Sequence, residues 1–352
     1  MVQARKRASS LKRATVLQLL VSILLAITTG AQGLLLQGLR RAFRGVRRVG
    51  KSPKFRGLAV QEGSVVRKEA ALTSVGIMSL VRDPRNIETW LDIHRQLGIK
   101  HFYISVEDSP VTFDYLDKLP FVTAKKSKGN GGVDEWWNLM GRQGDWDELA
   151  IWAARNDLHG VKWLVSMDAD EILWGNLSVI ENLPEKVRTF KLYNEEARYD
   201  KVPTLADNCF EATYFVKCWG QADPLNKKCN SYSNGKSGGR VAADVHPWGP
   251  HYMRSDGIKP GNSPWLEGIR IRHYDSCSFS KWKSKFWHLA GRKKHKKDPG
   301  MIWYHESMEA IRSNNIVNMY KTYKKYKVLT KGDLEKIKKR GLQALSSMSV
   351  LL

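Results

Sequence analysis

Three carboxylates in four positions, Asp168, Asp170 and Glu171, follow a mostly apolar run in the stretch VKWLVSMDADEILWGN, residues 161–176. Carboxylates resist burial unless they are paired or bind a cation. Two aspartates at positions i and i+2 of an extended chain point to the same side. Their oxygens could then hold one hard divalent cation, Mg²⁺ or Mn²⁺, which in turn binds phosphate oxygens. The alternative interpretation is an Asp-rich turn that caps the next segment.

The segments before this stretch alternate between strand and helix patterns. Strand patterns cover residues 73–81, 101–106, 121–124 and 161–167, and helical patterns cover 86–97 and 145–158. Gly98 and Gly160 follow the two helical patterns, as C-terminal glycines do. This alternation predicts an α/β fold with a mostly parallel, Rossmann-type sheet flanked by helices. Ligands of such sheets bind beyond the carboxyl ends of the strands, which is where Asp83, Glu107 and Asp168 stand.

Charge divides the chain into regions. The net charge is +23, yet residues 1–56 carry 13 Lys/Arg and no acid, and residues 281–340 carry 18 Lys/Arg against 5 acids, which leaves −3 for the middle. Basic ends of this kind are typical of targeting segments, solvated helical faces or contacts with an anionic partner. We therefore predict four parts: a targeting or signal-anchor segment (1–40), a basic stem or linker (41–72), an α/β domain (73–290) and a basic helical C-terminal extension (291–352).

The apolar run between Arg13 and Arg40 is long enough to cross a bilayer, because it has 26 uncharged residues and about 20 suffice. Three interpretations remain open. The run is a single-pass signal anchor with the following domain in the lumen of the endoplasmic reticulum or Golgi, a secretory signal peptide with small residues at 29–31 for cleavage, or an organelle transit peptide. The basic residues after the run outnumber those before it, which argues against the anchor orientation.

The four cysteines, Cys209, Cys218, Cys229 and Cys277, lie within 69 residues. Their spacing does not match a zinc pattern such as C-x₂-C. If the domain is lumenal we expect two disulfides, for which three pairings are possible. The sequence also contains one N-glycosylation sequon, Asn176-Leu177-Ser178, whose closeness in sequence to the acidic stretch argues against its occupancy.

Several motifs together resemble the glycosyltransferases of the family 2-like and family 92 group. They are W-L-x-x-H-x-x-L-G-I-x-H-F-Y-I from Trp90 to Ile104, G-R-Q at 141–143, the D-A-D-E stretch, Y-S-N-G-K-S-G-G-R at 232–240, G-P-H at 249–251 and R-H-Y-D-S-C at 272–277. The motifs occur in the order typical of the group and span roughly residues 73–290. The resemblance implies a GT-A fold, which is one Rossmann-like α/β domain that binds a nucleotide-sugar through a D-x-D metal site.

The resemblance also implies roles for individual residues. Asp168 and Asp170 would hold the divalent ion on the diphosphate, and His251 of G-P-H would complete the metal site. Asp83, Arg142 and Gln143 match positions of the group that contact the nucleotide. Arg82-Asp83 stands where the group has Asn-Glu, however, and Thr89 replaces a glutamate, so the nucleotide base is left open.

Two further residues are judged from their own surroundings. Lys236 follows Asn234-Gly235, a strong turn dipeptide, and its ammonium could also meet a phosphate. His94 ends an apolar helical stripe, so we interpret it as a buried packing residue.

Glycosyl transfer requires the leaving diphosphate to be neutralised, by a metal ion and nearby cations. An inverting enzyme also needs a carboxylate to deprotonate the acceptor hydroxyl. The candidates are Glu196, Glu211 and Asp244, with Glu196 favoured because N-E-E-A-R-Y resembles a stretch of the group.

The sequence thus predicts a membrane-anchored, Mn²⁺- or Mg²⁺-dependent glycosyltransferase that acts with inversion. The resemblance implies a UDP-sugar donor, with galactose as the first guess, and a glycan or glycoconjugate acceptor. One alternative is an inactive glycan-binding protein with the same fold. The other is a nucleic-acid-binding protein that uses the basic, aromatic-rich C-terminal region; the slightly acidic core and the N-terminal apolar run argue against it, so we expect no nucleic-acid partner.

Overall fold

The computed structural model describes residues 72–339 except for 83, 128–138, 156–158, 205–206, 220–222, 224, 226, 228, 231, 258–261 and 291–301. The chain divides into two compact units, Met1–Val65 and Val66–Leu352, and every described residue belongs to the second. The predicted targeting segment and nearly all of the stem lie outside the described residues. Within those residues, no helix combines the length and the apolar character needed to cross a membrane.

Strands and helices alternate in the first half of the described chain, as the sequence predicts, and helices close it. Their order is β1 (Val75–Arg82), α3 (Ile87–Gln96), β2 (His101–Glu107), α4 (Pro110–Leu116), β3 (Val122–Lys126), α5 (Leu139–Arg155), β4 (Trp163–Ser166), β5 (Glu171–Gly175), α6 (Ser178–Glu181), β6 (Thr189–Arg198), β7 (Tyr214–Lys217), β8 (Lys236–Arg240), β9 (Val245–Pro247), β10 (Met253–Ser255), β11 (Trp265–His273), α7 (Phe279–Ala290), α8 (Ile302–Arg312), α9 (Ile316–Lys327) and α10 (Lys331–Lys339).

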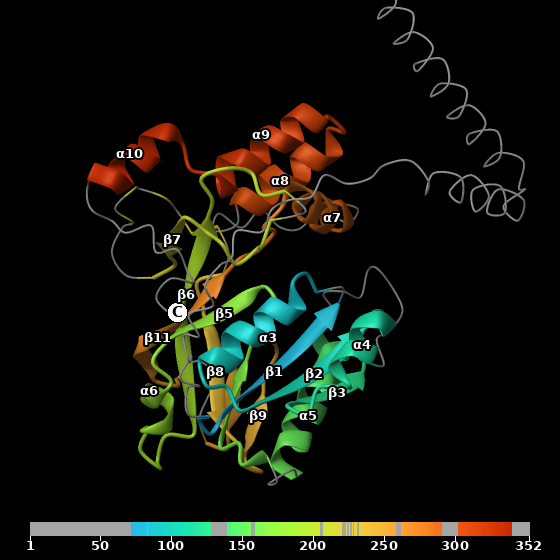
Figure 1. Ribbon diagram of the computed structural model, residues 1–352, viewed down its shortest axis with the longest axis vertical. Helices are drawn as coiled ribbons and strands as arrows, with labels where there is room; N and C mark the ends of the chain where they lie inside the picture. Colours follow the sequence, from blue (N-terminus) through green and yellow to red (C-terminus); the bar gives the residue numbers. More distant parts are fainter. Residues whose placement is uncertain are drawn as a thin grey trace, which may run out of the picture. The chain divides into compact units, whose positions relative to one another are not determined.

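A nine-stranded sheet forms the centre of this unit, in the order β3-β2-β1-β4-β8-β6-β11-β5, with β7 paired to β6 (Figure 1). Strands β1 to β4, β6 and β11 run in one direction, and β5, β7 and β8 run against them. Strands β9 and β10 form a separate two-stranded sheet. The prediction of a Rossmann-type α/β fold with a mostly parallel sheet flanked by helices is confirmed.

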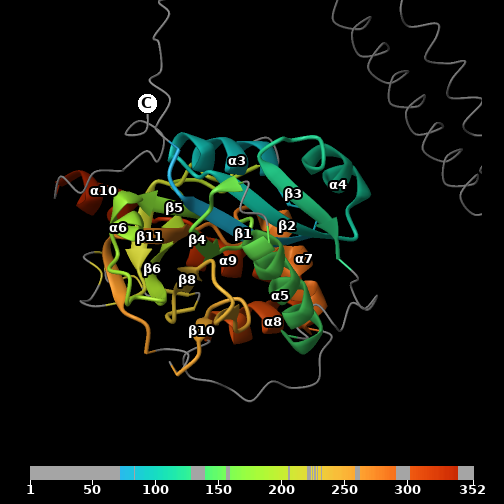
Figure 2. The same ribbon diagram turned by 90° about the horizontal axis from the view of Figure 1, so that it is seen from below.

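The two faces of the sheet are covered by different helices, because side chains alternate along each strand. Ile77 and Phe102 pack with Trp90 of α3 on one face, and Met78 and Tyr103 pack with residues of α5 on the other. Figure 2 shows α3 and α4 on one side of β1–β3 and α5 on the other side. The central strands are therefore buried on both faces.

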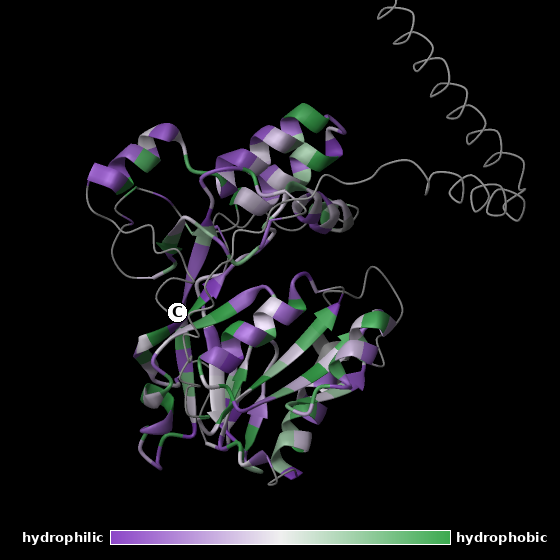
Figure 3. Cartoon of the chain, in the orientation of Figure 1, coloured by the Kyte–Doolittle hydropathy of each residue, from purple (hydrophilic) through white to green (hydrophobic). Residues whose placement is uncertain are grey.

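The last helices form a second apolar cluster around Trp282, Phe286 and Tyr323, which are fully buried. Figure 3 shows mostly hydrophilic residues along α10, and α9 and α10 are rich in lysine, so the predicted basic helical C-terminal segment is confirmed. It is joined to the sheet, because Tyr199 just after β6 exchanges backbone hydrogen bonds with Lys327 (3.0 Å) and Leu329 (2.8 Å). The end of α9 therefore sits at the carboxyl end of β6.

Helix α3 is fixed to β5 by two buried aromatic side chains. His94, fully buried as predicted, donates from Nδ1 to the carbonyl of Trp90 (2.8 Å) and accepts at Nε2 from the N–H of Leu173 (3.0 Å). Trp90 donates from its indole nitrogen to the carbonyl of Glu171 (2.6 Å). Burial lowers the pKa of His94 to about 3, although the hydrogen bond to Trp90 opposes this shift. The ring is therefore neutral in the folded protein.

The buried neutral histidine predicts a loss of stability in mild acid. In the unfolded chain His94 titrates near pH 6.5, so below that pH the unfolded chain binds a proton that the folded protein excludes. The free energy of unfolding should fall by about 1.4 kcal/mol per pH unit on this account as the pH drops from 6.5 towards 3. The change His94→Gln keeps a donor and an acceptor but removes the titration.

Urea unfolding at pH 6.5 and pH 5.0 measures this difference. The wild-type protein should lose about 2 kcal/mol more than His94→Gln over this interval. Equal losses in the two proteins would show that the histidine is not held neutral.

Candidate active site

The acidic stretch forms a tight turn between β4 and β5. The N–H of Glu171 donates to the carbonyl of Asp168 (3.1 Å), and the N–H of Asp168 donates to the carboxylate of Glu171 (2.8 Å). The expectation of an extended chain is wrong here, since the chain reverses within these four residues. Strand alternation therefore does not put the two aspartates on one side, and each has different partners.

Asp168 is paired with a lysine from the neighbouring strand β8. Lys236 is fully buried, and its Nζ lies 2.6 Å from Oδ2 of Asp168 and 3.4 Å from Oε2 of Glu171. Glu171 also accepts a hydrogen bond from the hydroxyl of Tyr232. Burial raises the pKa of Glu171 to about 7, whereas the nearby acids outweigh burial for Lys236 and raise its pKa. Lys236, predicted to meet a phosphate, is the internal counterion of this turn.

The Asn234-Gly235 turn brings His251 to the same place. Gly235 has φ of 63°, and a Cβ there would lie 2.1 Å from the carbonyl oxygen of Leu192, so only glycine fits. The carbonyl of Gly235 accepts a hydrogen bond from Nδ1 of His251 (2.8 Å). Burial, and then the charge of Lys236, lower the pKa of His251 to about 3. The His251 ring is therefore neutral near pH 7.

Asp170 meets a different group, at the end of β11. His273 Nε2 lies 3.7 Å from Oδ2 of Asp170, and Asp275 follows two residues later. One ligand atom from each of these three residues lies within 4.8 Å of the others. The Asp170 side chain is 47 % exposed, while His273 and Asp275 are buried. Two carboxylates and an imidazole therefore converge here, one from the turn before β5 and two from the end of β11.

Two atoms of this group are left without hydrogen bonds. Among the described residues, Nδ1 of His273 and Oδ2 of Asp275 are buried and have no hydrogen-bond partner. The other oxygen of Asp275 accepts from Nζ of Lys285 on α7 (2.8 Å), and Lys327 Nζ lies 4.0 Å from Oδ2. Buried polar atoms are nearly always satisfied, so these two point to a missing partner. The Asp–His–Asp donor set fits a divalent cation.

Glu196, the favoured candidate for the base, lies beside this group on β6 and is aligned with His273 of β11. One of its oxygens is 2.7 Å from Nζ of Lys327 and the other accepts from the N–H of Asn230 (2.5 Å), with Arg198 close to both. Burial alone would raise the pKa of Glu196, but Arg198 and Lys327 lower it to about 2. Glu196 is thus ionised, and its role as the base stays a prediction.

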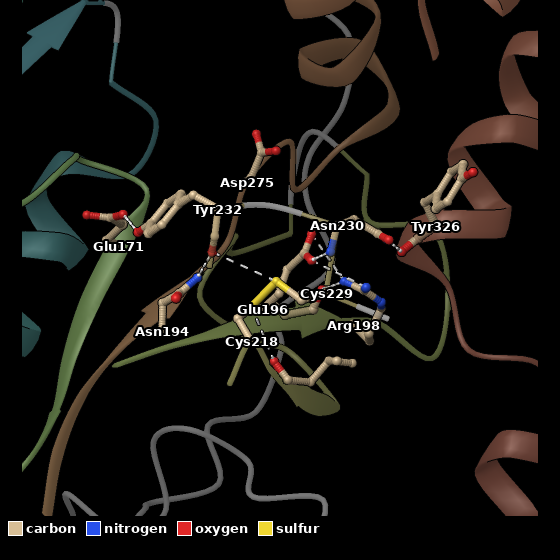
Figure 4. The surroundings of a disulfide bond; sticks show 12 residues. Glu171, Asn194, Glu196, Arg198, Cys218, Cys229, Asn230, Tyr232, Asp275 and Tyr326 are labelled. Carbon is tan, nitrogen blue, oxygen red and sulfur yellow. Dashed lines mark hydrogen bonds and ion pairs between the residues drawn. A yellow bond between two sulfur atoms is a disulfide. The ribbon is translucent and has the colours of Figure 1, made fainter. Parts of the chain in front are cut away.

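The four cysteines form the disulfides Cys209–Cys277 and Cys218–Cys229, which selects one of the three possible pairings. Figure 4 shows the second disulfide next to Glu196, with Tyr232 reaching from the same loop to Glu171. Its sulfurs are bonded to each other, so the proximity of Glu196 does not make a metal site.

The remaining candidate bases lie elsewhere. Glu211 is exposed in a turn after Phe210. Asp244 forms an ion pair with Arg188 and follows β8, whose last residues pair with the start of β4, so it lies at the opposite end of the sheet from Asp168.

The predicted nucleotide contacts are only partly described. Glu107 ends β2 and pairs with Arg82 at 3.6 Å. Arg142 and Gln143 lie in α5, but the positions of their side chains fall outside the described structure, and Asp83 is outside it altogether.

Sequence reasoning missed the partners that complete the group around Asp170. His273 is the last residue of β11 and Asp275 follows two positions later, an i, i+2 spacing at a strand end like that of Asp168 and Asp170. Lys285 and Lys327 had no such signal, because a lysine in a basic helix normally faces solvent.

Comparison with known proteins gives little further information. No family model matches the chain, and no curated protein matches it. One solved structure that it is similar to is a candidate glucose-1-phosphate thymidylyltransferase from Bacillus anthracis in complex with sucrose. The identity is 12% and the TM-score 0.21, over 66% of this chain and 82% of the other. A likeness at this level does not identify a function.

The buried pairing of Lys236 predicts a large effect of its removal. In Lys236→Met, Glu171 stays buried next to Asp168 without a counterion, so the free energy of unfolding should fall by about 3–5 kcal/mol. Lys325→Met is the matched control, because its pair with Glu306 is on the surface (58% and 36% exposed) and should be worth about 1 kcal/mol or less. Urea denaturation at pH 7 compares them, and equal losses would contradict the pairing.

Proposed function

We propose that this protein is a metal-dependent glycosyltransferase that moves a sugar from a nucleotide-sugar, UDP-galactose being the first donor to test, to a hydroxyl of a glycan or glycoconjugate. The proposal rests on the convergence of Asp170, His273 and Asp275 at the carboxyl end of the sheet. Nδ1 of His273 and Oδ2 of Asp275 are buried there and have no hydrogen-bond partner among the described residues. Ligands of open α/β sheets bind at this end.

In this proposal Asp170, His273 and Asp275 hold the divalent cation, Mn²⁺ or Mg²⁺. When bound, it would neutralise the developing charge on the leaving diphosphate. The expectation that Asp168 and His251 are also ligands stays a prediction, and for Asp168 the ion would have to displace Lys236 or share the carboxylate with it.

The protein's own residues orient this site. Lys285 donates to one oxygen of Asp275, and the other oxygen has no hydrogen-bond partner among the described residues. Lys327 lies between Glu196 and Asp275 and compensates part of the charge of both carboxylates. The ring of Tyr232 packs against both histidines, with its centroid 4.3 Å from that of His251 and 5.1 Å from that of His273.

Membrane anchoring with a lumenal domain in the Golgi or endoplasmic reticulum forms part of the proposal. Its support is the apolar run before Arg40 and the two disulfides, since disulfides persist in oxidising compartments. The mature N-terminus of the purified protein, read by sequencing, separates an anchor from a cleaved signal peptide.

The function is tested by donor hydrolysis with the purified full-length chain. A panel of nucleotide-sugars is incubated with Mn²⁺ and then with EDTA, and released nucleotide is measured. One donor should be hydrolysed, EDTA should abolish the reaction, and Asp170→Asn and His273→Ala should each lower the rate by on the order of 100-fold. Glu306→Gln, which changes a surface carboxylate on α8, should leave the rate unchanged.

Thermal unfolding with and without Mn²⁺ tests the cation site separately from the transferase activity. If Mn²⁺ raises Tm in the wild-type protein but not in His273→Ala, the cation site stands. A cation site without hydrolysis of any donor would make the protein an inactive relative of glycosyltransferases. No effect of Mn²⁺ on either Tm or hydrolysis would exclude the metal site itself.

A further inference from the structure

The sequon Asn176-Leu177-Ser178 lies well away from the candidate active site. Strand β5 begins at Glu171 in the acidic turn and runs to Gly175, so Asn176 stands at its other end. Five residues of strand, at roughly 3.3 Å each, separate the two by about 17 Å. Closeness in sequence to the acidic stretch is therefore no argument against occupancy of this sequon.

The side chain of Asn176 is exposed to solvent, and its backbone is held in place by a buried neighbour. Asn176 is exposed, whereas Leu177 beside it is buried in the core, which fixes the backbone of the turn. The side-chain carbonyl of Asn176 accepts from the N–H of Ser178 (2.9 Å). Its amide nitrogen makes no hydrogen bond to any residue that the structure describes. The atom that would be modified is thus free, and the third residue of the sequon lies beside it.

We propose that Asn176 carries an N-linked glycan. The reaction joins Nδ2 of Asn176 to the anomeric carbon of an oligosaccharide carried on a polyisoprenyl diphosphate. The bond from that carbon to the diphosphate oxygen breaks, the diphosphate leaves with the electron pair, and one amide proton is released. The proposal is independent of the glycosyltransferase activity, but it requires the domain to enter the secretory lumen, which the two disulfides favour.

The glycan would also lie at the end of an edge strand of the sheet. In the part of the chain that the structure describes, β5 pairs with β11 alone, so it is an edge strand of the sheet. Exposed edges are sites where two molecules pair through their backbones. A bulky, hydrophilic chain at the end of β5 would hinder such pairing without touching the carboxyl ends of β4 and β11.

The test expresses the full-length chain in a eukaryotic cell line and treats it with peptide N-glycosidase. Wild-type protein and Ser178→Thr, which keeps the sequon, should shift in mobility after treatment. Asn176→Gln and Ser178→Ala should migrate at the deglycosylated position without treatment. Mass analysis of the treated peptide should show that Asn176 has become aspartate.

Ser178→Ala and Ser178→Thr both change the partly exposed first residue of α6, and only Ser178→Thr keeps the hydroxyl, so a glycan in Ser178→Thr but not in Ser178→Ala shows that the sequon is required. No mobility shift of the wild-type protein, or a shift that persists in Asn176→Gln, would overturn the proposal. Donor hydrolysis by the enzymatically deglycosylated protein is measured in parallel, so that loss of the proposed function and absence of the glycan are read separately.

Discussion

The compensation of buried charge governs the carboxyl end of the sheet. Lys236 and Lys327 are almost completely buried, and so are Glu171, Glu196 and Asp275. An unpaired charge buried in the protein would cost several kcal/mol, so each of these groups must lie next to a group of opposite charge. The pairing of Lys236 with Asp168 and Glu171 connects β8 to the acidic turn, and the pairing of Lys327 with Glu196 connects α9 to β6.

The same requirement makes the C-terminal helices part of the site. Lys285 of α7 reaches Asp275 (2.8 Å), and Lys327 at the end of α9 reaches Glu196 (2.7 Å). Tyr323 of α9 adds a hydrogen bond to the carbonyl of Cys277 (2.8 Å), which is itself held by a disulfide to Cys209. Lysines from α7 and α9 thus keep the carboxylates at the strand ends ionised, although only Lys327 belongs to the predicted basic extension.

Local patterns were sufficient to predict the fold, whereas the site depends on distant pairs. Period-2 and period-3.6 runs with Gly98 as a stop located β1, α3, β2 and β4, because these signals arise within a few residues. The pair Glu196–Lys327 joins residues 131 positions apart, and no local signal encodes it. The acidic turn was misjudged for a related reason: the hydrogen bonds that reverse the chain at Asp168 involve the side chain of Glu171, which an alternation rule ignores.

The two aspartates of the acidic turn differ in one respect that decides where an added cation belongs. Asp168 already has the ammonium of Lys236 at 2.6 Å, so a metal ion there must displace a buried cation or share its carboxylate with it. Asp170 has no Lys or Arg partner among the residues that the structure describes, and its one ionic neighbour there is His273. One oxygen of Asp275 accepts a hydrogen bond from Lys285, and the other oxygen has no hydrogen-bond partner among the described residues. Asp170 is therefore the aspartate of the turn that a divalent ion can join without displacing a lysine.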